Sequence, residues 1–412
     1  MLLGVDFGTC NTSAALVFDG KIRLLKEPLK HGYSFPSSVY LTEEGEMLVG
    51  QSAEYNRMQN VHRYRREFKR DLGIKDPYLI GERSISPQEL VTEVLKKLKS
   101  EAAKITTALG KEEITDAVIA VPATYQQYKR NLIQKAVEAA GFSFVKLVEE
   151  PVAAAIYYAH HNITQLQEEE IILVYDLGGG TFDATLIKKQ GTGYQILSTP
   201  MGLEDCGGTD FDRLIYEDIQ NRCTKVLGQQ LKEKSAWRNR AKVYEQCIQI
   251  KHQLSEAQEA TVHIPPTWEN YQLSRVSFSQ MIAPLINETI AICNQLIQAA
   301  GIDWKNINQV LLVGGSCRIA GVRNSLEKKV RHPPLLVDDP ELAVCQGAAI
   351  YGIDLNSKPK SIQGEVKKQK EVKPNLKTSS NHPYNFSGDP FDAFGEKAVS
   401  QNNDSTSVDD WF

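Results

Sequence analysis

The chain has 412 residues and a formal net charge of −4, and 42% of its residues are hydrophobic and 24% are charged. This composition is typical of a soluble globular protein with room for two sizeable cores, and nothing in it indicates nucleic-acid binding. The first residues enter a strand without a secretion signal, and no apolar run approaches membrane-spanning length, so we expect a cytoplasmic protein without membrane contact. The seven cysteines are scattered without metal-binding spacing and are expected to be reduced.

The first predicted element is a hairpin over residues 2–16. A short apolar strand leads to Asp6, and a turn of glycine and small polar residues leads into a second strand. Glycine lacks the Cβ atom that would keep a phosphate away from the backbone, so the N–H groups of such a turn can point into one anion site. We interpret this hairpin as a phosphate-binding element.

A basic run and an alternation of helices and strands follow. Five basic residues lie between Arg63 and Arg70, and a solvated basic surface is the simplest interpretation of such a run. Hydrophobic periodicity then predicts helices over 87–108, 125–140 and 150–160 and strands over 114–121 and 144–148.

A second hairpin repeats the pattern of the first. An apolar run at 171–175 precedes three consecutive glycines at 178–180 and a further strand, and Asp176 and Asp183 flank the glycines. Carboxylates beside a phosphate would repel it unless a divalent cation lies between them, so the pattern predicts Mg²⁺. A tight glycine-rich turn in a β-protein is the alternative for this hairpin alone. Because Asp6 corresponds to Asp176, the two hairpins suggest two similar lobes that face one nucleotide.

The rest of the chain contains a third glycine-rich element and a polar tail. Residues 213–300 are mostly helical in pattern, with a strand near 261–264, and a later buried-type strand ends at Gly314 and Gly315, where the backbone can approach a flat ligand. From residue 356 onward apolar residues are few, so we expect disorder. This tail is rich in lysine first and in acids with a few aromatic residues later, which suggests either a solvated tail or a segment that a tail-binding protein captures.

Three further segments, at 121–123, 149–155 and 207–212, occur in order with these elements. Together they resemble the ATPase domain of DnaK-type heat-shock chaperones over about residues 1–353. Actin, bacterial filament proteins and sugar kinases share only the hairpins and the Gly-Gly strand. The resemblance implies an α/β protein with the actin-like ATPase fold, in which two lobes of ribonuclease-H-like architecture surround a nucleotide cleft. It places lobe I at 1–165 with a closing helix at about 341–353, lobe II at 166–355 and the disordered tail at 356–412.

The resemblance also implies slow hydrolysis of ATP to ADP and phosphate with Mg²⁺. Lys69 would stabilise charge on the transferring phosphate, and the other four basic residues of its run would stay solvated. Acidic and hydroxyl side chains would position the attacking water and order the water shell of the metal. The catalytic residues implied are Lys69, Glu150, Asp176, Thr181 and Asp183, and the metal would be held through water by Asp6 and Asp176.

Nucleotide contacts and an allosteric relay are implied in the same way. Pro122 and Arg130 match positions that relay the nucleotide state to a partner domain. The implied nucleotide-binding residues are Gly8, Thr9, Cys10, Asn11, Gly178, Gly179, Gly180, Thr181, Gly207, Gly208, Lys251, Ser255, Gly314, Gly315, Ser316, Arg318 and Glu341.

The chain also departs from the family pattern. Ile248 and His252 replace the glutamate and arginine that hold adenosine, so we expect weaker or less base-selective nucleotide binding. Residues 74–86 are shorter than the matching family segment, which predicts the loss of a hairpin. No leucine-rich linker or peptide-binding β-sandwich follows residue 353, so we expect any peptide binding to come from a partner.

We therefore expect an ATP-hydrolysing, heat-shock-chaperone-like module of protein folding or quality control. The resemblance implies a J-domain co-chaperone or a nucleotide-exchange factor as partner. One alternative is a nucleotide-gated regulatory or scaffold protein that does not hydrolyse ATP. Another is an actin-like small-molecule kinase, although the sequence contains no recognisable motif for an acceptor.

Overall fold

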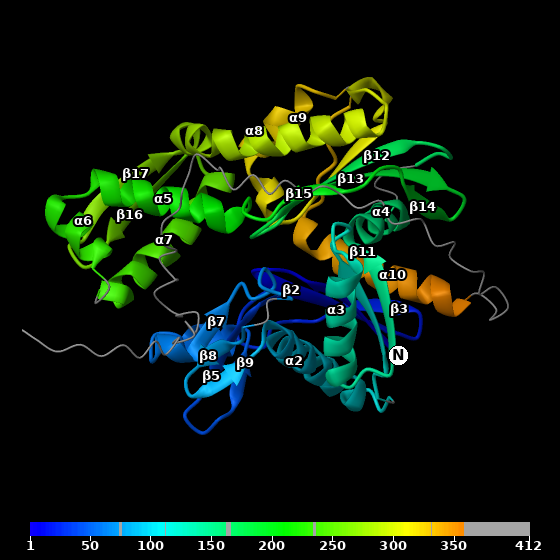
Figure 1. The fold of residues 1–412 in the computed structure, drawn as a ribbon, viewed down its shortest axis with the longest axis horizontal. Helices are drawn as coiled ribbons and strands as arrows, with labels where there is room; N and C mark the ends of the chain where they lie inside the picture. Colours follow the sequence, from blue (N-terminus) through cyan, green and yellow to red (C-terminus); the bar gives the residue numbers. More distant parts are fainter. Residues whose placement is uncertain (74–75, 112, 162–165, 234–235, 331, 358–412) are drawn as a thin grey trace, which may run out of the picture.

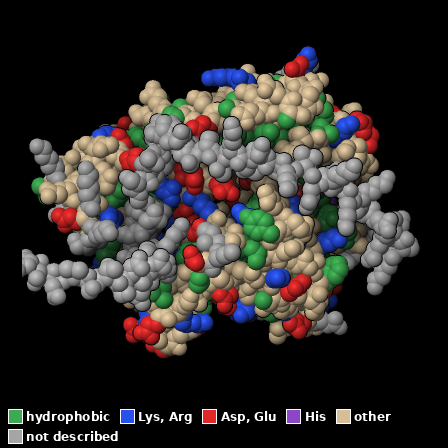
Figure 2. Space-filling view, in the orientation of Figure 1, with side chains coloured by type: hydrophobic (Ala, Val, Ile, Leu, Met, Phe, Trp, Pro, Cys, Tyr) green, Lys and Arg blue, Asp and Glu red, His purple; other side chains and the backbone are tan. Residues whose placement is uncertain are grey.

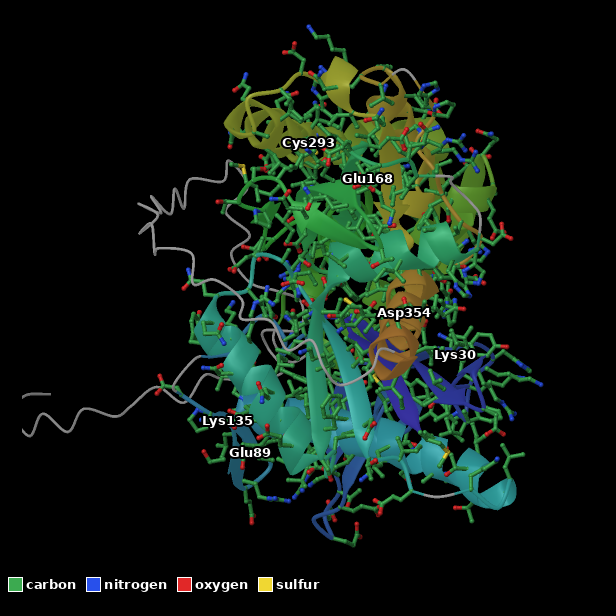
Figure 3. All side chains as sticks on the ribbon, turned by 90° about the vertical axis from the view of Figure 1, so that its right-hand side faces the viewer. Lys30, Glu89, Lys135, Glu168, Cys293 and Asp354 are labelled. Carbon is green, nitrogen blue, oxygen red and sulfur yellow. The ribbon has the colours of Figure 1, made fainter. Side chains whose placement is uncertain are left out.

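The computed structural model describes residues 1–357 apart from 74–75, 112, 162–165, 234–235 and 331. Two lobes face each other, one in blue and teal and one in green and yellow, and the orange helix α10 (Ala343–Ser357) crosses between them (Figure 1). In the side view of Figure 3, Glu89 lies on the first lobe, Cys293 on the second, and Asp354 of α10 between them. The predicted two-lobed α/β architecture is therefore confirmed.

Lobe I is built on a six-stranded mixed sheet. Its central strand β1 (Leu2–Phe7) is antiparallel to β2 (Asn11–Phe18) and parallel to β10 (Asp116–Val121). The edges are β3 (Lys21–Leu24) and β11 (Phe144–Glu149), and β4 (Ser34–Pro36) also pairs with β2. The other elements of this half of the chain are β5 (Ser38–Leu41), β6 (Met47–Val49), β7 (Tyr64–Arg66), β8 (Tyr78–Ile80), β9 (Arg83–Ile85), α1 (Gln51–Asn56), α2 (Pro87–Ala108), α3 (Gln127–Ala139) and α4 (Glu150–His160).

Lobe II repeats the central part of this sheet. Its central strand β12 (Ile171–Leu177) is antiparallel to β13 (Phe182–Gln190) and parallel to β18 (Gln309–Val313). β14 (Gly193–Ile196) and β15 (Met201–Leu203) both pair with β13. The remaining elements are β16 (Glu259–Ile264), β17 (Glu269–Ser274), α5 (Gly208–Arg222), α6 (Lys225–Lys232), α7 (Trp237–Glu256), α8 (Arg275–Ala299) and α9 (Ala320–Glu327).

The two hairpins occupy equivalent positions in the two sheets. In lobe I, Asp6 of β1 lies opposite Ser13 of β2 in the strand register. In lobe II, Asp176 of β12 lies opposite Asp183 of β13. The equivalence of the two aspartates that the sequence predicted therefore holds in three dimensions, and lobe II carries a second acid where lobe I has a serine.

Local sequence explains the long helix α2, which begins and ends where it was predicted. Ser86 accepts a hydrogen bond from the Glu89 backbone N–H, and the Glu89 side chain accepts one from the Ser86 backbone N–H. This reciprocal capping box and Pro87 in the first turn define the start of the helix. The side chains of Leu90, Val94 and other apolar residues at helical spacing are buried in the lobe I core.

A third core, apart from those of the two lobes, lies between the facing sheets. It is formed by small side chains of α4 and α10, such as Ala154 and Ala348, together with residues of both sheets. A Cβ atom on Gly347 of α10 would overlap the carbonyl oxygen of Ala153 and lie 2.5 Å from its carbonyl carbon. The predicted close approach of two helices at the glycine and alanines of the closing helix is thus confirmed.

We expect Gly347→Ala to lower the free energy of unfolding by about 3 kcal/mol, because the added methyl group must push α10 away from α4. Urea denaturation monitored by circular dichroism measures this. Gly193→Ala is the matched control, since a Cβ atom there would meet only the Gln190 carbonyl oxygen at 3.8 Å. Equal stability of the two variants would contradict this account of the helix contact.

Helix α8 is long and apolar enough to cross a membrane by length and composition, with a mean hydropathy of 1.2 over its most apolar part. This differs from the expectation that no apolar run approaches that length. Leu285, Ile286 and Leu296 on this helix are buried in the lobe II core. A core helix of a soluble protein passes the same test.

The structure contains two strand pairings that the sequence analysis did not predict. The segment predicted to lack a hairpin contains one, formed by β8 and β9. A second strand, β17, pairs with the predicted strand near 261–264. The proposed tail falls almost wholly on residues 358–412, which lie outside the described residues, and the proposed lobe limits remain predictions.

The basic run is also not a solvated surface, because all of its residues are at least partly buried. Arg63 donates to the Thr42 carbonyl oxygen at 2.9 Å, Arg65 lies over a tyrosine ring, and Arg66 pairs with Glu67 at 3.3 Å. Thr42 and Tyr78 come from other segments of the chain, so the run itself carried no local sign of these two partners.

Candidate functional site

Glycine-rich segments from both lobes meet between the sheets. A Cβ atom on Gly179, in the β12–β13 turn, would lie 2.6 Å from Cys10 Sγ in the β1–β2 turn. A Cβ atom on Gly207, at the start of α5, would lie 2.6 Å from the Gly180 backbone nitrogen. These distances leave no room for a side chain, so the close approach of the two turns depends on glycine.

The turn of lobe II has its carbonyl groups occupied and its amide groups available. The Gly178 carbonyl oxygen accepts from Ser316 Oγ at 2.7 Å and from the Gly208 N–H at 3.1 Å. The Gly179 carbonyl oxygen accepts from the Thr209 N–H at 2.7 Å. Within the described part of the chain, no acceptor takes up the N–H groups of Gly179 and Gly180. Such a row of free amides is a concave anion site.

Ser37 supports the turn of lobe I in the same way. Its hydroxyl donates to the Gly8 carbonyl oxygen at 2.8 Å, and its backbone N–H donates to the Cys10 carbonyl oxygen at 2.8 Å. In a trans peptide the carbonyl of one residue and the N–H of the next point in opposite directions. The N–H groups of Thr9 and Asn11 therefore point away from Ser37. Sequence reasoning missed this serine, because nothing near it in the chain marks its contact with the turn.

Lys69 and Glu150 form a buried ion pair beside the two turns. Lys69 Nζ lies 3.2 Å from Glu150 Oε1, and the two side chains are only 10% and 9% exposed. Burial by itself would lower the pKa of Lys69, but Glu150, Tyr125 and Asp6 raise it above its ordinary value. The neighbouring acids therefore favour the charged form of Lys69. The structure thus brings together two residues that lie 81 positions apart and that were predicted to be catalytic.

Three aspartates surround this ion pair. Burial and then the charge of Glu150 raise the pKa of Asp6 and that of Asp183 to about 7. The same two causes, followed by the neighbouring aspartates, raise the pKa of Asp176 well above its ordinary value, while Lys69 lowers it. So many buried acids around one lysine fit a site that receives a divalent cation. Among the described residues no group of three or more His, Cys, Asp or Glu side chains could hold a metal directly.

Polar contacts cross between the lobes near these acids. Thr124 Oγ1, from the segment after β10, donates to Asp183 Oδ1 at 2.9 Å and lowers the pKa of that carboxyl. The predicted relay residue Arg130 pairs with Glu149 Oε1 at 3.1 Å, and Pro122 is buried at the end of β10. Thr124 was not predicted, since a lone threonine after a strand gives no functional signal. Figure 2 shows Lys, Arg, Asp and Glu side chains gathered between the lobes.

The two predicted nucleotide-binding side chains of helix α7 have partners within the protein. Lys251 Nζ is held by Asp212 Oδ2 at 2.7 Å and by the Gly208 carbonyl oxygen at 2.8 Å. Ser255 Oγ donates to the carbonyl oxygen of His252, its own helical neighbour, at 2.5 Å. Ile248 packs against the lobe II core. Lys251 therefore supports the start of α5, and the hydroxyl of Ser255 is already engaged.

The remaining predicted residues lie at the end of β18. Arg318 pairs with Glu341 at 3.1 Å and with Asp339 at 3.1 Å, so two predicted nucleotide residues are joined in one ion-pair group. A Cβ atom on Gly314 would lie 2.8 Å from Asp176 Oδ1, whereas one on Gly315 would meet open space. Gly314 thus packs against the central hairpin, and Gly315 is exposed.

The chain is similar to one family model and to chaperone proteins of two organisms. The family model described as Hsp70 protein matches residues 75–363. The chaperone protein DnaK of Picrophilus torridus is 32% identical over 375 residues, which cover 88% of this chain and 59% of that protein. DnaK of Methanothermobacter thermautotrophicus is 31% identical over 362 residues, covering 85% and 59% respectively. This chain therefore spans well under two thirds of the length of these relatives.

Proposed function

Since the chain belongs to the Hsp70 family and has its actin-like ATPase fold, we propose that it binds Mg²⁺-ATP between the two lobes and hydrolyses it slowly. The ion pair of Lys69 with Glu150, set beside the two turns and the Gly179 and Gly180 amides that have no acceptor among the described residues, is the observation that carries this proposal. Family membership alone would not place a buried cation and a phosphate cradle at one point in this chain.

Each group has a definite part in the proposed reaction. The amides of the turns at 8–11 and 178–181 bind the β- and γ-phosphates, and Lys69 stabilises the charge that develops during transfer. Glu150 with Thr181 and Asp183 positions the attacking water, while Asp6 and Asp176 orient the water shell of the metal. Bound Mg²⁺ would supply charge neutralisation on the phosphates. Positioning and electrostatics account for nearly all of such catalysis.

We place this activity in cytoplasmic protein folding or quality control. The relatives are named as chaperones, which supports this role. Partners of the J-domain and nucleotide-exchange type, and a relay through Pro122 and Arg130, belong to the same proposal. The half-buried Arg130 pairs with Glu149, which directly precedes Glu150, and this contact gives the proposed relay a physical route to the site.

Single-turnover hydrolysis of Mg²⁺-ATP by the full chain, measured beside equilibrium binding, tests the proposal. We expect saturable binding followed by slow conversion to ADP that requires Mg²⁺. Failure to bind ATP would overturn the proposal. Binding without turnover would instead establish the alternative, a nucleotide-gated regulatory protein, which the engaged Lys251 and the apolar Ile248 on α7 favour.

We expect His252→Arg to tighten ATP binding by about 2- to 5-fold, because a guanidinium stacked on the base contributes about 0.5–1 kcal/mol. Burial, and then the charges of Lys251, Lys30 and Arg318, lower the pKa of His252 to about 4, so this side chain is neutral at pH 7 and offers no cation. Calorimetric titration of both proteins with ATP measures the change.

The matched control is Gln253→Arg, which adds the same charge to an exposed neighbouring position of α7. An equal gain of affinity in both variants would show that the effect is general charge attraction. The predicted position of the base beside α7 would then be wrong.

A further inference from the structure

Arg70 reaches across from lobe I to the turn of lobe II. Its Nη2 atom donates to the Gly180 carbonyl oxygen at 2.5 Å, to Thr209 Oγ1 at 3.3 Å and to Asp210 Oδ2 at 3.5 Å. Its Nη1 atom lies 3.4 Å from Glu67 in its own lobe. The side chain is only 16% exposed, so the guanidinium is held from both sides rather than lying on the surface.

This contact completes a pattern in the turn of lobe II. Three successive carbonyl groups, those of Gly178, Gly179 and Gly180, are all occupied. Lobe II itself occupies the first two, through Ser316 and the start of α5, whereas the third is held from lobe I. The last peptide of the turn is therefore the one whose orientation depends on the opposite lobe.

Peptide geometry links the Arg70 contact to the orientation of a backbone N–H group in the phosphate-binding turn. Because a carbonyl and the following N–H point in opposite directions, fixing the Gly180 carbonyl on Arg70 aims the Thr181 N–H away from Arg70. No acceptor among the described residues takes up this N–H group. When Arg70 is absent or the lobes move apart, the Gly180 carbonyl loses its partner and this peptide can rotate.

The neighbouring residue strengthens the argument. Lys69 pairs with Glu150 in lobe I, while Arg70 holds the turn of lobe II. Two consecutive side chains thus connect the cation of the site to the phosphate-binding turn of the other lobe. The residue that holds the turn of lobe II is therefore the immediate chain neighbour of the cation of the site.

We propose that Arg70 is a positioning residue that couples the approach of the two lobes to the orientation of the Thr181 amide. This inference rests on the proposed function, because it concerns how the same phosphate cradle is completed. In this role Arg70 orients the backbone, which a positive charge alone would not do. Its planar guanidinium group contacts the Gly180 carbonyl and neighbouring carboxylates at the same time.

The test compares the parent with Arg70→Met and Arg70→Lys in the full chain. Single-turnover hydrolysis is expressed as the rate per bound ATP, so that unfolded molecules do not count. We expect Arg70→Met to lower this rate by roughly 10- to 100-fold, the order of loss that follows when a catalytic group is misplaced by about 1 Å. The fall in ATP affinity should be smaller than the fall in rate.

Arg70→Lys keeps the charge beside Glu67 and Asp210 but cannot reproduce the fork, so its rate should lie between the other two. Arg63→Met is the control, since Arg63 belongs to the same basic run but donates only to carbonyls of lobe I. Its rate should stay within about 2-fold of the parent, because these carbonyls lie at the end of β5 and in the turn that follows it, in lobe I and outside the site. If Arg70→Met does not fold, Arg70→Lys decides by the same comparison.

The outcomes separate this inference from the proposed function. Hydrolysis by the parent with an unchanged rate per bound ATP in the Arg70 variants overturns the inference and leaves the function standing. Binding without hydrolysis by the parent overturns the proposed hydrolysis. ATP dissociation then decides the inference, with faster dissociation from Arg70→Met supporting it and an equal rate overturning it. Absence of ATP binding by the parent overturns both.

Discussion

Replacing Lys69 by alanine is expected to lower the single-turnover rate of ATP hydrolysis by about 100-fold or more, the usual cost of removing a preorganised charge-stabilising group. The substitution leaves Glu150 buried without its cation. It also removes the charge that lowers the pKa of Asp6 and Asp176, so both carboxyls shift toward their protonated forms. ATP binding should fall by less than about 10-fold, because the backbone amides of both turns remain.

Lys129→Ala is the matched control for this prediction. Both lysines lie over the Tyr125 ring, at 5.9 Å for Lys69 and 5.3 Å for Lys129, but Lys129 pairs loosely with Glu204 at 3.8 Å. We expect Lys129→Ala to hydrolyse ATP at close to the parental rate. Equal losses in the two variants would mean that general positive charge near Tyr125 matters. Full activity in Lys69→Ala would remove this residue from the mechanism.

A single methyl group on Gly179 is expected to reduce the affinity for Mg²⁺-ATP by about 100-fold, because overpacking at a close contact costs up to about 3 kcal/mol. The added Cβ atom would lie 2.6 Å from Cys10 Sγ and 2.8 Å from Cys10 Cβ. The two phosphate-binding turns would have to separate. Nucleotide titration of Gly179→Ala, with circular dichroism to show that the fold persists, measures this loss.

A second substitution makes the cause of that loss testable. Cys10→Gly removes both atoms that the new methyl group would meet, so the double variant should recover most of the lost affinity. Gly321→Ala serves as the control, because a Cβ atom there would make only ordinary contacts with Ser279 at 3.6 Å and beyond. Continued weak binding in the double variant would show that flexibility of Gly179, and not the contact with Cys10, is what the site requires.

Much of the fold could be predicted because its signals are local. The capping box at Ser86 and the helical spacing of apolar residues define α2 within its own segment. The two hairpins carry an aspartate at the end of a strand and glycines in the turn, a pattern set by the strand register and by the need for bare backbone. The β8–β9 hairpin was missed because its strands have only three residues each, too few to show a period. Strand β17 alternates exposed and buried side chains but buries only Tyr271 and Leu273, and it was also missed.

The candidate site also has features that the sequence predicts and features that only the structure shows. Sequence by itself determined which segments must bring backbone close to a ligand, because only glycine permits that approach, and which acids and lysine match a nucleotide site. Only the tertiary structure decided what holds those groups in place. Ser37 reaches the first turn, Arg70 reaches a carbonyl 110 residues away, and Lys251 is held by Asp212. Such partners leave no mark at either position in the chain, because hydrogen bonds between distant segments depend on how the lobes pack and not on local periodicity.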